Sequence, residues 1–296
     1  MSKKRNKYAG DQGPGYSPDG AASYLGLGRS LNITSGSGRT ALIAAALAAA
    51  AYGIWRLRGG LAFDDAMMAG LGMFLCFIFS YVVAQELDPD RSLGGIIAGG
   101  LTVATTMYFG EGNMLILLWL VFVLRMLNRS AGDRHRIVDN VFLLGSAIWL
   151  GRDGLWLYPI ITGVAYALES QLPNGYFRSL YLAAIALASL LVAKIEFIPV
   201  SISITYFVVI AVAYILFLPE LRMALLTRAK GDKDGRTLDG KRLQATQIFF
   251  MLLVIAVVLV HGESQAIGIM PAVMAAAGAG IYLVVDLINN KKKYQR

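Results

Sequence analysis

The chain has 296 residues, of which 56% are hydrophobic and only 16% are charged, and its mean hydropathy is +0.58. A soluble domain usually carries about a quarter charged residues, so this composition excludes an ordinary soluble protein. The net charge is +8, but the basic residues flank long apolar runs and no nucleic-acid-binding motif accompanies them. The sequence therefore indicates a membrane protein, predicts anionic membrane lipids as partners of the basic residues, and excludes nucleic acid.

The first segment of the chain, 1–39, is basic and rich in glycine and serine, with few large apolar side chains. Such a segment cannot bury enough surface to fold alone, so we expect it to be disordered and cytoplasmic. No signal peptide is visible in it. The chain also has a single cysteine, Cys76, which lies in an apolar run and therefore predicts neither an internal disulfide nor a thiol metal site.

Apolar runs follow one another from residue 40 onward, and although several of them are short, each is a candidate to cross a bilayer as a helix. Two of them, 138–150 and 155–168, are separated by only four residues, so they form either two spans with a tight turn or one re-entrant pair. The sequence thus predicts an all-α, polytopic bundle of about ten transmembrane helices, with eight as the alternative. The ten runs are 40–57, 66–85, 93–109, 113–127, 138–150, 155–168, 179–193, 200–218, 246–260 and 266–288.

The distribution of basic residues predicts the orientation of these spans. If the amino terminus is cytoplasmic, ten spans place 23 of the 27 lysines and arginines on the cytoplasmic side. This agrees with the excess of basic residues found on cytoplasmic loops. We therefore expect a multi-pass protein of the cell membrane with both termini in the cytoplasm.

The same pattern divides the chain into segments. We expect a transmembrane body at 40–218, a basic cytoplasmic loop at 219–245, a terminal transmembrane hairpin at 246–288 and a basic tail at 289–296. The loop is interpreted as a solvated hinge. The spans are rich in glycine and alanine, which let helix backbones approach closely in lipid.

One cluster of charged residues follows the second apolar run. It contains Glu86, Asp88 and Asp90, with Pro89 and Arg91 beside them. Carboxylates at a membrane surface hold Mg²⁺ in some enzymes that act on phosphorylated substrates. The simpler interpretation is a tight turn in which Arg91 neutralises one carboxylate. No cofactor is required by the sequence, and Mg²⁺ is the one that this cluster would hold.

A second cluster follows the fourth run, on the same predicted side of the membrane. Arginine side chains suit phosphate, and the start of the next helix adds backbone donors. The alternative is a topogenic loop with internal ion pairs. The candidate phosphate-binding residues are Arg125, Arg129, Arg134, Arg136 and Asn140, and the candidate metal ligands here, in addition to Glu86, Asp88 and Asp90, are Asp133 and Asp139.

Three functions are consistent with these features. The first, slightly favoured, is a site for a phosphorylated lipid or polyprenyl substrate at the cytoplasmic face. The others are a small-solute transporter or channel, and a non-catalytic membrane scaffold with a protein partner that the sequence does not indicate. No catalytic motif is present, and the spacing of Glu86, Asp88 and Asp90 does not match the aspartate motifs of CDP-alcohol phosphotransferases or UbiA-type prenyltransferases. The residues leave open whether the protein is an enzyme.

Overall fold

A computed structural model gives the fold, and it describes residues 26–28, 36–196 and 201–289. Over these residues the chain is helical apart from turns, short loops and an isolated bridge between Lys230 and Thr237. The predicted all-α class is therefore confirmed. The helices are α1 (Gly36–Arg58), α2 (Phe63–Leu87), α3 (Leu93–Phe109), α4 (Met114–Asn128), α5 (Ile137–Arg152), α6 (Leu157–Gln171), α7 (Ser179–Ala188), η1 (Ser189–Val192), α8 (Ile204–Phe217), α9 (Glu220–Met223), η2 (Ala224–Leu226), α10 (Gly240–His261) and α11 (Glu263–Asn289).

Each of the ten predicted spans overlaps one of these helices. By length and composition, five helical segments in the described chain are long and apolar enough to cross a membrane. Such helices fit an integral membrane protein, whereas the number of spans, ten or eight, and their orientation stay predictions. The five segments are Gly36–Arg58, Phe63–Leu87, Ile204–Leu226, Gly240–His261 and Glu263–Asn289, and Leu93–Phe109, Met114–Asn128 and Ser179–Val192 are shorter apolar helices.

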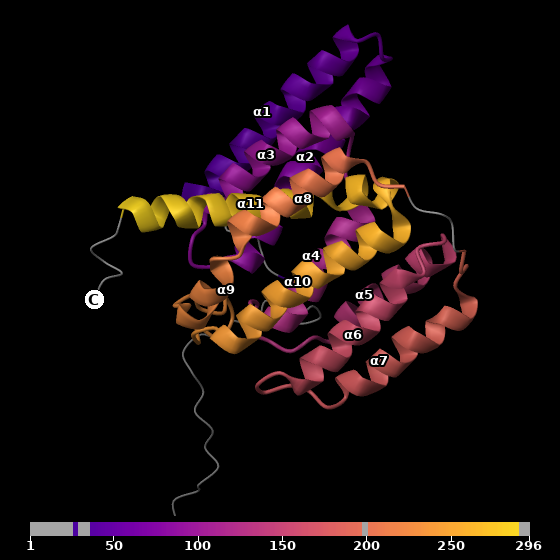
Figure 1. Cartoon of the computed structure of the whole chain (residues 1–296), viewed down its shortest axis with the longest axis vertical. Coiled ribbons are helices and arrows are strands. Elements are labelled where there is room, and N and C mark those ends of the chain that lie inside the picture. The colour runs from indigo at the N-terminus through magenta and orange to yellow at the C-terminus, as the bar shows by residue number, and fades with distance from the viewer. Residues whose placement is uncertain (1–25, 29–35, 197–200, 290–296) are drawn as a thin grey trace, which may run out of the picture.

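Helix α11 packs against several other helices. It contacts α2, α3, α8 and α10, and its position among the other helices is seen in Figure 1. All of its residues from 268 to 280 are buried. A Cβ added to Gly278 would lie 2.5 Å from the backbone nitrogen of Ala98 in α3, so the two helices meet at backbone distance. Small residues permit this approach in lipid, where close packing drives helix association. Residues of the predicted terminal hairpin, 246–288, thus form part of the hydrophobic core.

Helices α5, α6 and α7 form a second group, away from α1, α2 and α3 (Figure 1). Helix α4 joins the two groups, because it contacts α2 and α11 on one side and α5 and α6 on the other. Its side chains Trp119, Leu120 and Leu124 are completely buried. The indole nitrogen of Trp119 donates to Thr162 Oγ1 of α6 at 3.1 Å, which satisfies a polar group that burial would otherwise penalise.

The structure describes only part of the two terminal segments. Of the predicted disordered segment, 1–39, it describes 26–28 and 36–39, and the tail residues 290–296 lie outside the described residues. Residues 36–39 form the start of α1, and Leu27 is completely buried. Composition alone does not predict this packing of Leu27.

The predicted solvated loop, 219–245, contacts the turn that follows α4. The backbone nitrogen of Asp232 donates to the carbonyl oxygen of Ser130 at 3.2 Å, and that of Lys233 donates to the carbonyl oxygen of Ala131 at 3.2 Å. The loop also contains the short helices α9 and η2. Its contacts therefore bring two charged loops, far apart in the sequence, to the same end of the bundle.

Candidate functional site

Most of the charged residues singled out in the sequence lie at one end of the bundle, where α2, α4 and α6 end and α10 begins. They form three sets of ion pairs, named here after their central residues: the Glu86 group, the Arg91 group and the Glu169 group. A pocket that carries further arginine side chains opens beside the Glu169 group.

The Glu86 group joins the two predicted clusters. Arg125 Nε donates to Glu86 Oε1 at 3.0 Å, and Ser130 Oγ donates to Glu86 Oε2 at 2.5 Å. Asn128 Nδ2 donates to the backbone carbonyl of Glu86 at 2.6 Å. Glu86 and Arg125 are both buried, so each charge depends on the other for the solvation that it has lost. Arg125 is therefore committed to an internal ion pair rather than directed toward a phosphate.

In the Arg91 group, a single guanidinium meets carboxylates from three parts of the chain. Arg91 Nη1 lies 3.2 Å from Asp88 Oδ2 and 3.5 Å from Glu220 Oε2, and Arg91 Nε lies 3.2 Å from Asp286 Oδ2. Burial raises the pKa of Asp88, and the charge of Arg91 offsets part of that rise. The turn at 88–91 is thus closed by an ion pair that also attaches it to α9 and α11.

The five carboxylates predicted as Mg²⁺ ligands are dispersed. Glu86 and Asp88 belong to the two groups above, Asp90 accepts from the backbone nitrogen of Arg228 at 3.0 Å, and Asp133 pairs with Arg136 at 2.7 Å. Within the part of the chain that the structure describes, no three side chains of the metal-binding types gather around a common point. The predicted ligands are occupied by ion pairs and backbone donors instead.

Asp139, the fifth predicted ligand, accepts hydrogen bonds from three backbone nitrogens. Its Oδ2 accepts from the backbone nitrogens of Gly26 at 2.8 Å, Leu27 at 3.2 Å and Arg136 at 2.7 Å. The last of these caps the first turn of α5. A Cβ on Gly26 would lie 2.1 Å from the carbonyl oxygen of Arg134, so only glycine fits at this position. The carboxylate thus attaches the amino-terminal segment to the end of the bundle.

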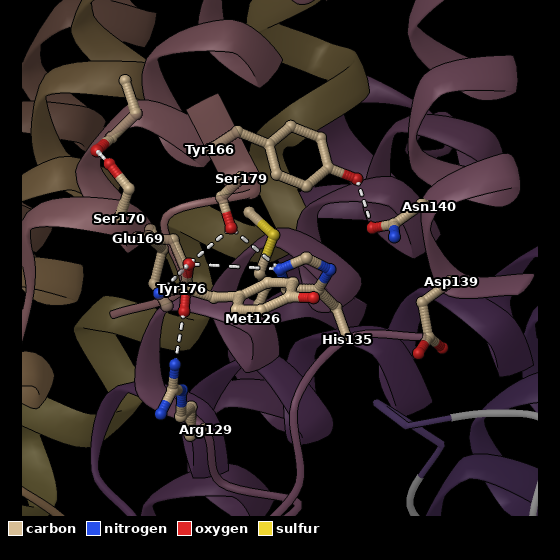
Figure 2. Close-up of polar contacts among 12 residues, drawn as sticks. Met126, Arg129, His135, Asp139, Asn140, Tyr166, Glu169, Ser170, Tyr176 and Ser179 are labelled. Atoms are coloured by element: carbon tan, nitrogen blue, oxygen red, sulfur yellow. Dashed lines mark hydrogen bonds and ion pairs between the residues drawn. The ribbon is translucent and has the colours of Figure 1, made fainter. Parts of the chain in front are cut away.

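The Glu169 group is the most highly connected of the three (Figure 2). Glu169 is completely buried at the end of α6. Its Oε1 accepts from Arg129 Nη2 at 2.7 Å and lies 3.5 Å from Arg242 Nη2. Its Oε2 accepts from Ser179 Oγ at 2.6 Å and from the backbone nitrogen of Tyr176 at 3.2 Å. One carboxylate therefore connects the ends of α4 and α6 with the starts of α7 and α10.

Arg242 is only 3% exposed, although it lies in a segment predicted to be a solvated loop. Its Nε donates to the carbonyl oxygen of Leu127 at 2.8 Å, Nη1 to that of Pro173 at 2.8 Å, and Nη2 to that of Met126 at 3.4 Å. Only a guanidinium offers enough donors in one plane for such a set of acceptors. The side chain thus satisfies the last carbonyls of α4, which have no partner within the helix.

His135 lies next to the Glu169 group (Figure 2). Its Nε2 is 3.0 Å from Ser179 Oγ, and its Nδ1 has no hydrogen-bond partner among the described residues. The imidazole packs edge-on against the rings of Tyr166 and Tyr176. Burial lowers the pKa of His135, and the Glu169 carboxylate offsets part of that lowering. The ring is therefore expected to be neutral at neutral pH.

A pocket of about 610 Å³ opens beside His135, between the first turns of α5 and α7. Arg136 and Arg178 line it, together with Tyr176. The guanidinium groups of Arg134 and Arg178 make cation–π contacts with Tyr176, at 5.2 and 5.8 Å from its ring centre. Neither Arg134 nor Arg178 has an ion-pair partner in the described chain. We call this cavity the arginine pocket.

The arginine pocket contains part of the predicted phosphate-binding set. Arg136 and Asn140 line it, and Arg134 stacks on its tyrosine, whereas Arg125 and Arg129 are committed to the Glu86 and Glu169 groups. Three further residues of the pocket were not among the predicted phosphate-binding residues. One lies within the second cluster, and two lie in the connection between α6 and α7. They are His135, Tyr176 and Arg178.

Comparison with known proteins adds no assignment. No family model, curated protein or solved structure matches this chain. What the site can do is therefore argued from its own chemistry. The residues that line the arginine pocket include guanidinium groups and no carboxylate, so the pocket presents hydrogen-bond donors and positive charge to an anion.

Replacement of Arg242 tests the role of the Glu169 group in stability. Arg242→Met removes the donors to three carbonyls and half of the positive charge on Glu169, so we expect a loss of about 3 kcal/mol in the free energy of unfolding. Thermal unfolding of the detergent-purified protein measures this as a lower melting temperature. The neighbouring Lys241→Met is the control, because Lys241 is exposed and its change should leave the melting temperature as it is. Equal melting temperatures for the two variants would contradict the assigned role of Arg242.

Proposed function

We propose that this integral membrane protein binds the phosphate-bearing headgroup of an anionic lipid in the arginine pocket. The observation that carries the proposal is the combination, in one cavity, of two arginines and exposed apolar side chains. Arg178 has no carboxylate partner in the described chain, and Arg136 pairs only with the partly exposed Asp133. Such a combination suits a ligand that has an anionic head and an apolar tail.

The guanidinium groups supply the anion-binding half. Arg178 has no ion-pair partner in the described chain, and Arg136 shares only the partly exposed Asp133. An arginine fork binds phosphate oxygens through parallel N–H donors, and stacking of Arg178 on Tyr176 holds the fork in place.

The apolar wall favours a lipid over a soluble phosphate compound. Ile137 is 80% exposed and Tyr181 is 65% exposed, and both line the pocket at the starts of α5 and α7. Phe177, which directly precedes Arg178, is 69% exposed. Apolar side chains exposed on this scale beside basic residues are the arrangement expected where a helix meets the boundary between headgroups and acyl chains.

The proposal includes a membrane arrangement. We infer ten spans, with the arginine pocket and both termini on the cytoplasmic side of the cell membrane. The ten helices support the span count, and the concentration of basic residues at the end that holds the pocket supports the orientation. The anionic lipids enriched in the cytoplasmic leaflet would then lie next to the pocket.

Binding of short-chain lipids tests the pocket. Dioctanoyl phosphatidylglycerol should raise the melting temperature of the purified protein, because a ligand that binds only the folded state stabilises it. Dioctanoyl phosphatidylcholine and glycerol 3-phosphate should raise it less, since the first is zwitterionic and the second has no acyl chains. Arg178→Gln should weaken phosphatidylglycerol binding about tenfold, the loss expected for one charge-assisted contact to phosphate.

The matched control is Arg152→Gln, which removes an exposed arginine from the opposite end of α5. This variant should bind like the unchanged protein. Equal weakening by both variants would mean that net charge alone attracts the lipid, and equal stabilisation by glycerol 3-phosphate would assign the pocket to a soluble ligand. A requirement for Mg²⁺, tested by adding EDTA, would show that the arginines do not suffice.

Cysteine labelling tests the span count and orientation. In a Cys76→Ala background, Arg152→Cys should react with a membrane-impermeant maleimide on intact cells. Gln171→Cys should react only after permeabilisation, because α6 separates the two positions and both side chains are exposed. The Cys76→Ala chain without a new cysteine is the control and should take no label. Labelling of both positions from the same side would show that α6 does not cross the membrane.

A further inference from the structure

His135 lines the arginine pocket, and its Nε2 lies 3.9 Å from Glu169 Oε2, which is an ion pair only when the imidazole is protonated. The residue is 8% exposed, and its two ring nitrogens have different surroundings. Figure 2 shows one nitrogen facing Ser179 and Glu169 and the other facing the side of Asn140, which also lines the pocket. The second nitrogen, Nδ1, has no hydrogen-bond partner among the described residues.

The hydrogen bonds of Ser179 determine which ring nitrogen carries the proton. Glu169 is paired with Arg129 at 2.7 Å and is therefore a carboxylate, which only accepts hydrogen bonds. Ser179 lies 2.6 Å from this carboxylate, so its single hydroxyl proton points to Glu169. The Ser179 oxygen is then left as an acceptor for His135, and the proton of the imidazole must be on Nε2.

It follows that Nδ1 of the neutral imidazole is a bare acceptor. Burial lowers the pKa of His135. The charges of Glu169 and Asp139 act in the opposite sense, as does a hydrogen bond to Asn140, whose Oδ1 can accept only from a protonated Nδ1, and Arg129 adds to the lowering. The neutral form is thus the one to consider at neutral pH. The nearest polar side chain on that side, Asn140, has its Oδ1 occupied by the hydroxyl of Tyr166 at 2.9 Å. A buried acceptor without a donor favours a ligand that supplies one.

We propose that His135 selects the headgroup: its Nδ1 accepts a hydrogen bond from a hydroxyl of the bound lipid, so the ligand class is a phosphodiester lipid with a hydroxylated headgroup. This inference rests on the proposed function, because it assumes that the lipid phosphate lies at Arg136 and Arg178. The arginines bind any anionic lipid through the phosphate. His135 distinguishes among such lipids by what the phosphate carries.

The test compares two lipids of equal charge. Dioctanoyl phosphatidylglycerol carries hydroxyls on its headgroup, and dioctanoyl phosphatidylmethanol has a methyl group in place of the glycerol. The unchanged protein should bind phosphatidylglycerol about five- to tenfold more tightly, the effect of one hydrogen bond to an otherwise unpaired acceptor. Isothermal titration of the detergent-purified chain measures both dissociation constants.

His135→Gln is the variant for this test. Glutamine has an amide N–H that can replace Nε2 as the donor to Ser179, but it has no acceptor at the position of Nδ1. In this variant the preference for phosphatidylglycerol over phosphatidylmethanol should disappear, and the affinity for phosphatidylmethanol should change little. Arg178→Gln, in contrast, should weaken both lipids to the same extent and leave their ratio unchanged.

Each outcome separates this inference from the proposed function. Equal binding of the two lipids by the unchanged protein overturns the role of His135 and leaves the pocket as an anionic-lipid site. A preference that survives in His135→Gln also overturns it. Binding of neither lipid overturns the proposed function and the inference together. If His135→Gln does not fold, His135→Asn takes its place, because asparagine keeps an acceptor near the position of Nδ1. A preference for phosphatidylglycerol over phosphatidylmethanol in both the unchanged protein and His135→Asn supports the role of His135, and its absence from the unchanged protein overturns it.

Discussion

The buried carboxylate of Glu169 determines the arrangement of the polar end of this molecule. A completely buried charge must be surrounded by donors, and Glu169 obtains them from Arg129, Ser179, the backbone of Tyr176 and Arg242. These donors come from four different helices or their connecting turns. The ion pair therefore holds the α6–α7 connection against α4 and α10, and the walls of the arginine pocket depend on that connection.

This constraint also divides the arginines into two kinds. Arginines of the first kind pair with buried carboxylates or donate to helix carbonyls, and these contacts occupy their guanidinium groups. They are Arg91, Arg125, Arg129 and Arg242. Arg134, Arg136 and Arg178 lie outside these groups, near the rim of the bundle, and two of them share the ring of Tyr176. The arginines therefore divide between two roles. Pairing inside the bundle holds the helix ends together, and the remaining side chains are the ones that we propose bind an anion.

Apolar runs predicted the helices well because a helix that meets lipid is a local property of the sequence. All ten predicted spans overlap helices, since the length of an apolar run needs no knowledge of its neighbours. The sequence also indicated that the clusters after α2 and α4 lie on one side, and Arg125 does meet Glu86. It could not show which arginine pairs with which carboxylate, because those pairs depend on how helices pack. Glu169 looked like an ordinary interfacial residue, and Arg242 looked like one basic residue of a solvated loop.

The site was predicted only in part for the same reason. Arg136 and Asn140 lie within one cluster, so their proximity could be expected from the sequence. Tyr176 and Arg178 come from a connection about forty residues away, which is brought to the start of α5 by the packing of α6 and α7 on α5 and by ring contacts of Tyr176 with His135 and Arg134. A weak signal existed for His135, a lone histidine within a run of arginines. Its position beside Ser179 and Glu169 depends on the packing of α6 and α7, which the sequence does not show.

The most direct test of the central claim is an experimental structure of the protein in lipid nanodiscs made of phosphatidylglycerol and phosphatidylcholine, determined by cryo-electron microscopy. The account predicts density for a lipid headgroup between Arg136 and Arg178, with its acyl chains along Ile137 and Tyr181 and its polar end toward His135. An arginine pocket without a headgroup, with ordered anionic lipid held elsewhere on the molecule, would contradict it.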